Sequence, residues 1–290
     1  MTYFEAILLG LVQGVFMFVP VSSTAHLVVT QHFLIAQGST MPPPESPAMI
    51  LFDLIVHVGT LVSIAIIFHA SLRTLIARSF SELRDRISAP ARIGERRIGV
   101  YSWLVLMGLL TVLVTGVLGL SLKSTFERVF GAPQILVFTL LITAALLLLT
   151  DRLRNLTLGV KQIGPRLAVI IGVAQAMALI PGISRSGITI IAGLFAGLKR
   201  RWAAEFSFLV AIPTILAASA LQAFEVARGT GMDGVGFGPL LVAFVVAAIS
   251  GTIALQLVLV ALYKAQLKIF SAYLVLLASA IAFGLFEGIL

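Results

Sequence analysis

The residue with the clearest chemical meaning is Arg185, which lies in the turn 181–189 with the sequence PGISRSGIT. The hydroxyls of Ser184, Ser186 and Thr189 accompany it, and the two glycines of the turn let a ligand approach the backbone closely. A guanidinium binds phosphate oxygens through paired hydrogen bonds, and a helix starting near Ser186 would add free backbone NH groups. The turn therefore predicts a cradle for a phosphate group.

A second group of polar residues follows Pro20 and consists of Ser22, Ser23, Thr24 and His26. A hydroxyl lies within reach of a histidine three or four residues further along the same helical turn. This arrangement suits nucleophilic attack on phosphorus, or proton delivery to a leaving oxygen. Ser23 and His26 are therefore the candidate catalytic residues.

Both groups also have a purely structural interpretation. Arg185 could extend its side chain to the membrane interface or pair with Asp53 or Glu205, and the hydroxyls before His26 could simply cap a helix. The serines and glycines on both sides of Arg185 exceed what an ion pair needs, so the phosphate cradle is favoured. His57, near the outer end of an apolar segment, is interpreted as a polar residue of the core.

Composition places these residues in a membrane protein. Of the 290 residues, 59% are apolar and 11% are charged, and the mean hydropathy is +1.10. Soluble chains average about a quarter charged residues, so this chain lacks the polar surface that water requires. The absence of cysteine excludes disulfides, thiolate metal sites and a cysteine nucleophile. We expect one membrane domain over residues 1–290.

Six segments are long and apolar enough to cross a bilayer, which takes roughly 20 residues. We expect spans at 49–69, 100–122, 134–150, 203–225, 237–263 and 268–289. Two further apolar stretches, 3–26 and 167–198, are interrupted midway by Pro, Gly, Ser and Thr, which predicts re-entrant helical hairpins. The expected fold is an all-α polytopic membrane protein with six transmembrane helices and two re-entrant hairpins.

The two interrupted stretches resemble each other. GLVQ at 10–13 precedes Pro20, GVAQ at 172–175 precedes Pro181, and a hydroxyl-rich turn follows each proline. If one stretch enters from each side of the bilayer, the chain consists of inverted repeats of about 1–150 and 151–290, with a site near the midplane where the interrupted helices meet. Chance similarity between apolar, proline-containing stretches is the alternative.

The basic residues indicate how the chain is oriented. With six spans, the segments 70–99, 151–166, 199–202 and 264–268 share one face and hold sixteen of the 20 Lys and Arg residues. The positive-inside rule makes this face cytoplasmic and puts both termini outside. The net charge of +8 is thus explained by topology and contact with anionic lipid heads, not by nucleic-acid binding.

Three motifs together resemble the undecaprenyl-diphosphate phosphatases of the bacitracin-resistance type. They are FVPVSSTAH at 18–26, PGISRSGIT at 181–189 and AAEFSF at 203–208, and the resemblance covers essentially the whole chain. It implies an enzyme of the bacterial inner membrane that hydrolyses undecaprenyl diphosphate to the monophosphate and inorganic phosphate. By this resemblance, the reaction would take place at the outer face and would recycle the lipid carrier for peptidoglycan.

The resemblance also implies roles for residues, by position in the motifs. Arg185 would be catalytic, and Ser23 and His26 would supply the nucleophile and the proton transfer, with their order open. The remaining substrate-binding residues would be Gln13, Ser22, Thr24, Ser184, Ser186 and Thr189.

One position departs from the family pattern. The family has a catalytic glutamate four residues after an acidic or amide residue, and here those positions are Gln13 and Met17. A thioether is a poor ligand for Mg²⁺ or Ca²⁺, which bind oxygen. Either Asp53 serves instead and holds a divalent cation, or the chain binds or flips polyprenyl phosphate without hydrolysing it, or Met17 is an engineered substitution.

Expected partners are the polyprenyl diphosphate, membrane lipids and a second copy of the chain in a homodimer.

Overall fold

The structure is a computed structural model that describes residues 1–290 except 45, 89–97, 123–132, 181, 229–234 and 287–290. Within the described residues the chain forms α-helices and one short 3-10 helix, η1, without a β-strand, which confirms the expected all-α class. The helices are α1 Tyr3–Phe18, α2 Ser23–Ala36, α3 Pro47–Ile67, α4 His69–Ser88, α5 Val100–Ser121, α7 Pro133–Thr150, η1 Val160–Gln162, α8 Pro165–Met177, α9 Arg185–Phe195, α10 Arg200–Arg228, α11 Phe237–Tyr263 and α12 Lys268–Phe286.

Among the described residues, four helices are long and apolar enough to cross a membrane: α3, α5, α10 as far as Leu221, and α11. They correspond to four of the six expected spans. The other two expected spans are the apolar helices α7 and α12, whose described apolar parts, Ile135–Thr150 and Lys268–Gly284, are shorter. Length and composition therefore support a polytopic membrane protein.

Each interrupted stretch is a pair of helices separated by a short break. In the first, α1 ends at Phe18, the C-cap Val19 is extended, and Ser22 takes a left-handed φ of 66° just before α2. Pro20 lies in this break because proline cannot continue a helix. In the second, Gly182 has a φ of 85° in the turn between α8 and α9. Both breaks lie where the sequence predicts them, although α2 runs ten residues past the expected end of the first hairpin.

Each first helix of the two stretches packs along a span from the other half of the chain. A Cβ added to Gly10 of α1 would lie 2.6 Å from the carbonyl oxygen of Ala243 in α11. The equivalent Gly172 of α8 would place a Cβ 2.8 Å from the carbonyl oxygen of Thr111 in α5. The first glycine of each GxxQ motif is therefore required for the close approach of two helix backbones.

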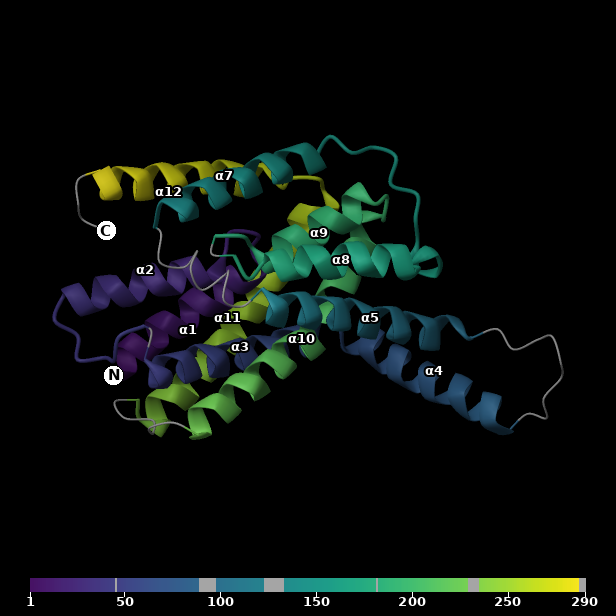
Figure 1. The fold of residues 1–290 in the computed structure, drawn as a ribbon, viewed down its shortest axis with the longest axis horizontal. Helices are drawn as coiled ribbons and strands as arrows, with labels where there is room; N and C mark the ends of the chain where they lie inside the picture. Colours follow the sequence, from purple (N-terminus) through teal and green to yellow (C-terminus); the bar gives the residue numbers. More distant parts are fainter. Residues whose placement is uncertain (45, 89–97, 123–132, 181, 229–234, 287–290) are drawn as a thin grey trace.

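Helices α7 and α12 lie side by side along one edge of the molecule (Figure 1). Ser271 of α12 donates to the carbonyl of Ala144 in α7 at 2.7 Å, and the Asp151 carboxylate accepts from the backbone nitrogens of Leu267 and Lys268. In Figure 1 the start of α1 and the end of α12 lie at one end of the molecule, and the starts of α5 and α8 lie at the other.

The expected connector 70–99 is largely helical, which the sequence analysis did not predict. Its helix α4 has no buried residue and lies beside α5 (Figure 1). Glu82 of α4 accepts hydrogen bonds from the backbone nitrogens of Tyr101 at 3.3 Å and Ser102 at 2.8 Å, in the first turn of α5. The carboxylate thus caps α5 and attaches α4 to it. Three of the arginines in this connector, Arg92, Arg96 and Arg97, lie outside the described residues.

Candidate phosphate-binding site

The break between α1 and α2 and the first turn of α9 meet at a cavity of about 180 Å³. Helices from both halves of the chain also contribute to it. Its lining residues are Met17, Ser22, Ser23, Thr24, His57, Thr115, Gln175, Ala178, Leu179, Ile183, Ser184, Arg185, Thr214, Ile215 and Ala218. The two groups of residues singled out by the sequence therefore share one cavity.

The first turn of α9 docks directly on the break that precedes α2. A Cβ on Gly187 would lie 3.1 Å from the Cβ of Pro20, so a larger side chain would push the two segments apart. The Ser186 hydroxyl donates to the carbonyl of Phe18, the last residue of α1, at 3.3 Å. Ser184 caps α9 by accepting from the Gly187 nitrogen at 3.2 Å. These contacts fix Arg185, the first residue of α9, relative to Ser23.

Arg185 has no carboxylate partner in the part of the chain that the structure describes. Asp53 instead accepts a hydrogen bond from Gln31 at 2.9 Å, and Glu205 pairs with Arg201 at 2.7 Å. The alternative pairing of Arg185 with Asp53 or Glu205 is therefore wrong. Its Nη1 atom is buried and unpartnered there. A cation without counter-charge at a helix N-terminus is an arrangement that binds anions.

The sulfur of Met17 lies where three hydrogen-bond donors converge. The Gln13 amide nitrogen is 3.3 Å from Sδ, and the Ser23 hydroxyl and Arg185 Nη2 are each 3.9 Å from it. A thioether is only a weak acceptor, so these donors are poorly satisfied. Amide, hydroxyl and guanidinium donors together suit a negatively charged oxygen.

The same donor set does not fit a resident divalent cation. Asp53 does not line the cavity, and no group of three or more His, Asp or Glu side chains that could hold a metal occurs among the described residues. Mg²⁺ and Ca²⁺ need oxygen ligands, and the side chains nearest Arg185 present donors and a sulfur.

His26 lies away from the cavity lining. Its Nδ1 is 2.8 Å from the carbonyl of Ser22, its Nε2 is 2.7 Å from the Tyr273 hydroxyl, and its ring stacks on Phe16 with the centroids 3.8 Å apart. His26 and Ser23 both belong to the described part of the chain, and no hydrogen bond joins them. The contact to Ser22 braces the residue with the left-handed φ, immediately before Ser23.

His57, interpreted from the sequence as a core residue, lines the cavity together with Ser23 and Arg185. Its Nδ1 lies 2.6 Å from the carbonyl oxygen of Asp53, one turn earlier on α3. Because a carbonyl only accepts, this bond puts the proton on Nδ1 and leaves Nε2 as an acceptor. The signal that could have found it is the histidine four residues after an intramembrane aspartate.

The other expected site residues divide into two groups. Ser22, Thr24 and Ser184 line the cavity. Thr189 does not line it, because its hydroxyl donates to the carbonyls of Arg185 and Ser186 within α9. Ser186 and Gln13 are likewise buried behind the lining residues. Pro181, the first residue of the second motif, lies outside the described residues.

Gln175 is a lining residue that the sequence analysis did not assign to the site. Its amide nitrogen donates to the hydroxyl oxygens of Thr115 at 3.1 Å and Thr214 at 2.9 Å, and its buried Oε1 has no partner in the described structure. The threonine hydroxyls donate to backbone carbonyls and so act as acceptors toward the amide. The signal was its place in the second GxxQ motif, where it is the counterpart of Gln13.

Comparison with known proteins shows the family of the chain. A family model described as bacitracin resistance protein BacA matches residues 6–280. The chain belongs to this family. Among its relatives, the undecaprenyl-diphosphatases of Halorhodospira halophila and Alkalilimnicola ehrlichii are each 53% identical to it, over 98% and 99% of this chain and 98% of theirs. The undecaprenyl-diphosphatase of Carboxydothermus hydrogenoformans is 34% identical over 97% of both chains.

Proposed function

We propose that the protein hydrolyses undecaprenyl diphosphate to undecaprenyl phosphate and inorganic phosphate, and thereby recycles the lipid carrier for peptidoglycan. The observation that carries the proposal is the guanidinium of Arg185, without a carboxylate partner in the described structure, in the same cavity as Ser23. Membership of the bacitracin-resistance family and relatives named undecaprenyl-diphosphatase support the substrate.

In the proposed reaction, Arg185 and the backbone nitrogens at the start of α9 bind the terminal phosphate. The Ser23 oxygen attacks its phosphorus, the hydroxyl proton passes to Nε2 of His57, and the bond to the bridging oxygen breaks. The electron pair of that bond leaves on undecaprenyl phosphate, while Arg185 offsets the charge that develops. Water then cleaves the phosphoserine and releases inorganic phosphate. Ser23 is favoured over His26 as nucleophile because it lines the cavity.

His26 acts in this proposal as a positioning residue. Its contact with the Ser22 carbonyl holds the break in which Ser23 is presented, and the Tyr273 hydroxyl and Phe16 ring hold the imidazole. A divalent cation enters only as a companion of the diphosphate, because the lining residues include no carboxylate to hold it.

The proposed membrane arrangement is that of six spans and two re-entrant hairpins in inverted repeats of about 1–150 and 151–290. The pairing of α1 with α11 and of α8 with α5 across the two halves supports it. Both termini and the mouth of the cavity would face the outside of the inner membrane. Bilayer lipids would cover the exposed apolar faces of the helices, and homodimer formation remains a prediction.

The experiment is phosphate release from undecaprenyl diphosphate by the full chain in detergent. Ser23→Ala should lower the rate by at least about a hundredfold, as loss of a directly participating group does. Ser279→Ala, an exposed serine of α12, is the matched control and should retain the wild-type rate. Wild-type protein that binds the lipid but releases no phosphate would overturn the proposal.

The second candidate function is non-hydrolytic carriage of polyprenyl phosphate between leaflets. Met17, at the position where the family pattern has a glutamate, is the observation in its favour. Proteoliposomes distinguish the two functions, because a carrier moves the lipid across the bilayer and produces no phosphate, whereas the proposed phosphatase produces phosphate from externally added diphosphate.

A further inference from the structure

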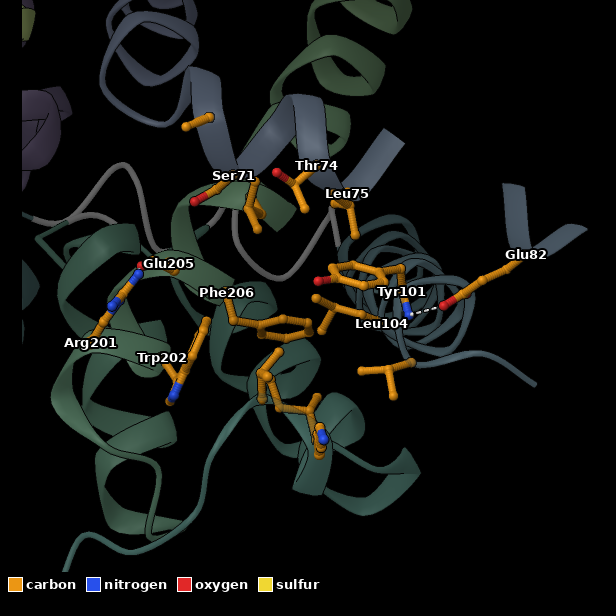
Figure 2. A pocket seen from close by; sticks show the side chains of 16 residues that line it. Ser71, Thr74, Leu75, Glu82, Tyr101, Leu104, Arg201, Trp202, Glu205 and Phe206 are labelled. Atoms are coloured by element: carbon orange, nitrogen blue, oxygen red, sulfur yellow. Dashed lines mark hydrogen bonds and ion pairs between the residues drawn. The ribbon is translucent and has the colours of Figure 1, made fainter. Parts of the chain in front are cut away.

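A second cavity lies between α4, α5, α10 and the segment Val160–Ile163, with a volume of about 560 Å³. Figure 2 shows Ser71 and Thr74 entering it from α4, Tyr101 from α5, and Trp202 and Phe206 from α10. None of its described lining residues lines the phosphate-binding cavity. Small-molecule sites typically have volumes of about 300–1,000 Å³, so this second cavity, the crevice, is large enough for a ligand.

The crevice continues into an apolar groove of about 200 Å³. The two share Leu75, Leu104, Phe206 and Leu209, so they adjoin each other along these residues. The far end of the groove reaches Gly108 of α5, where an added Cβ would have only the Val210 Cγ1 within 4 Å, at 3.7 Å. An elongated space that is polar at one end and apolar along the rest matches a lipid head group with its acyl chain.

The crevice lining contains two basic residues, Lys161 and Arg201, and two acidic residues, Glu82 and Glu205, and their partners decide which charge is available to a ligand. Lys161 is exposed at the crevice, and no acidic partner for it occurs in the described structure. The guanidinium of Arg201 lies 5.2 Å from the Trp202 ring and pairs with Glu205, and the Glu82 carboxylate is taken up by the backbone of α5. The segments around the crevice belong to the face with sixteen of the 20 basic residues.

We propose that this space binds an anionic phospholipid from the leaflet at the basic face. Its phosphate would lie at Lys161 and Arg201, and one acyl chain would run past Leu104 and Leu209 to Gly108. Trp202 in the lining matches the enrichment of tryptophan at the level of the lipid heads. The site is separate from the diphosphate cavity, so the proposal does not depend on hydrolysis.

Tryptophan fluorescence tests this directly, because the chain contains 2 tryptophans and only Trp202 lines the crevice. In Trp103→Phe protein, brominated phosphatidylglycerol should quench Trp202 in detergent at a concentration at least about fivefold lower than brominated phosphatidylcholine, as one contact between a basic residue and an anionic lipid provides. Inorganic phosphate should not change the quenching. In the complementary Trp202→Phe protein, Trp103 does not line the crevice and should show a smaller preference between the lipids.

Two glycines of α5 give a matched pair of variants. Gly108→Leu would fill the end of the groove and should abolish the preference for phosphatidylglycerol. At Gly116 nothing lies within 4 Å of an added Cβ and the residue is exposed, so Gly116→Leu should keep the preference. Lys161→Ala should lower it toward that of phosphatidylcholine. Equal quenching by the two lipids in Trp103→Phe protein, or an unchanged preference in Gly108→Leu protein, would overturn the proposal.

Discussion

The Sδ atom of Met17 lies 3.9 Å from Nη2 of Arg185, where α1 and α9 meet in the lining of the cavity. An acidic residue at position 17 would meet the guanidinium, the Gln13 amide and the Ser23 hydroxyl together. With methionine there, the charge of Arg185 stays available for a phosphate group. In this chain the arginine therefore faces a weak thioether acceptor and not a carboxylate at position 17.

Steady-state kinetics of Met17→Glu separate the effect of a carboxylate on substrate binding from its effect on the chemical step. The new carboxylate would pair with Arg185 and compete with the substrate phosphate, so we expect KM for undecaprenyl diphosphate to rise. It would also accept a hydrogen bond from Ser23 and help to remove its proton, so kcat should rise as well. Steady-state phosphate release over a range of lipid concentrations measures both constants.

Met17→Leu is the control, because it keeps the volume and the apolar character of the side chain. Both constants should stay close to those of the wild-type protein. An unchanged KM in Met17→Glu would contradict the idea that Arg185 binds the substrate directly. Release that occurs only in Met17→Glu would mean that the natural chain is a degenerate enzyme.

The packing of α8 on α5 should be sensitive to a single methyl group. A Cβ at Gly172 would lie 2.8 Å from the Thr111 carbonyl oxygen and from the Val114 Cβ. Gly172→Ala should therefore cost about 1–3 kcal/mol of stability and lower the thermal unfolding midpoint in detergent. Gly116→Ala, on the open side of α5, should leave the midpoint unchanged or slightly higher, and equal midpoints for the two variants would count against this packing.

The attachment of α4 to α5 should depend on pH through Glu82. Burial favours its neutral form, but hydrogen bonds from Ser102 and Tyr101 and the charge of Arg78 outweigh this and lower the pKa of Glu82 below its ordinary value of 4.5. A lowered folded pKa means that the stabilisation is present above the unfolded value and is lost as the pH falls through the folded value.

Amide hydrogen exchange at the start of α5 measures this attachment. Exchange should be slow at neutral pH and should accelerate, relative to the intrinsic rate, as the pH falls below the folded pKa of Glu82. In Glu82→Gln the exchange should be faster at neutral pH and should lose this pH dependence. Identical profiles for the two proteins would show that the carboxylate does not hold the helices together.

Orientation in the membrane can be tested with single cysteines, because the natural chain has none. Gln37→Cys, exposed after α2, should react with a membrane-impermeant maleimide in intact spheroplasts. Lys264→Cys, exposed after α11, should react only after the membrane is opened. The reverse pattern would place the basic face outside and the cavity mouth on the cytoplasmic side.

The sequence predicted the elements of the site better than their contacts. The breaks at Pro20 and before Arg185 were predictable because proline, glycine and hydroxyl residues interrupt the apolar stretches there. An arginine within the second stretch also indicated a site, because a charged residue in the membrane needs a function or a partner. The roles of His26 and His57 were not, because which imidazole faces the cavity depends on the rotation of α2 and α3. The helix α4 was missed because its charges suggested a solvated connector, whereas Glu82 makes a long-range cap on α5.

The most direct test of the central claim, that the guanidinium of Arg185 binds the diphosphate, is phosphate release by Arg185→Ala compared with Arg154→Ala. Arg185→Ala should lose at least about a hundredfold in kcat/KM, as removal of a transition-state hydrogen-bond donor does. Arg154→Ala removes an exposed arginine that lies outside the cavity lining, so it should keep the wild-type rate. Undiminished phosphate release by Arg185→Ala would contradict the account.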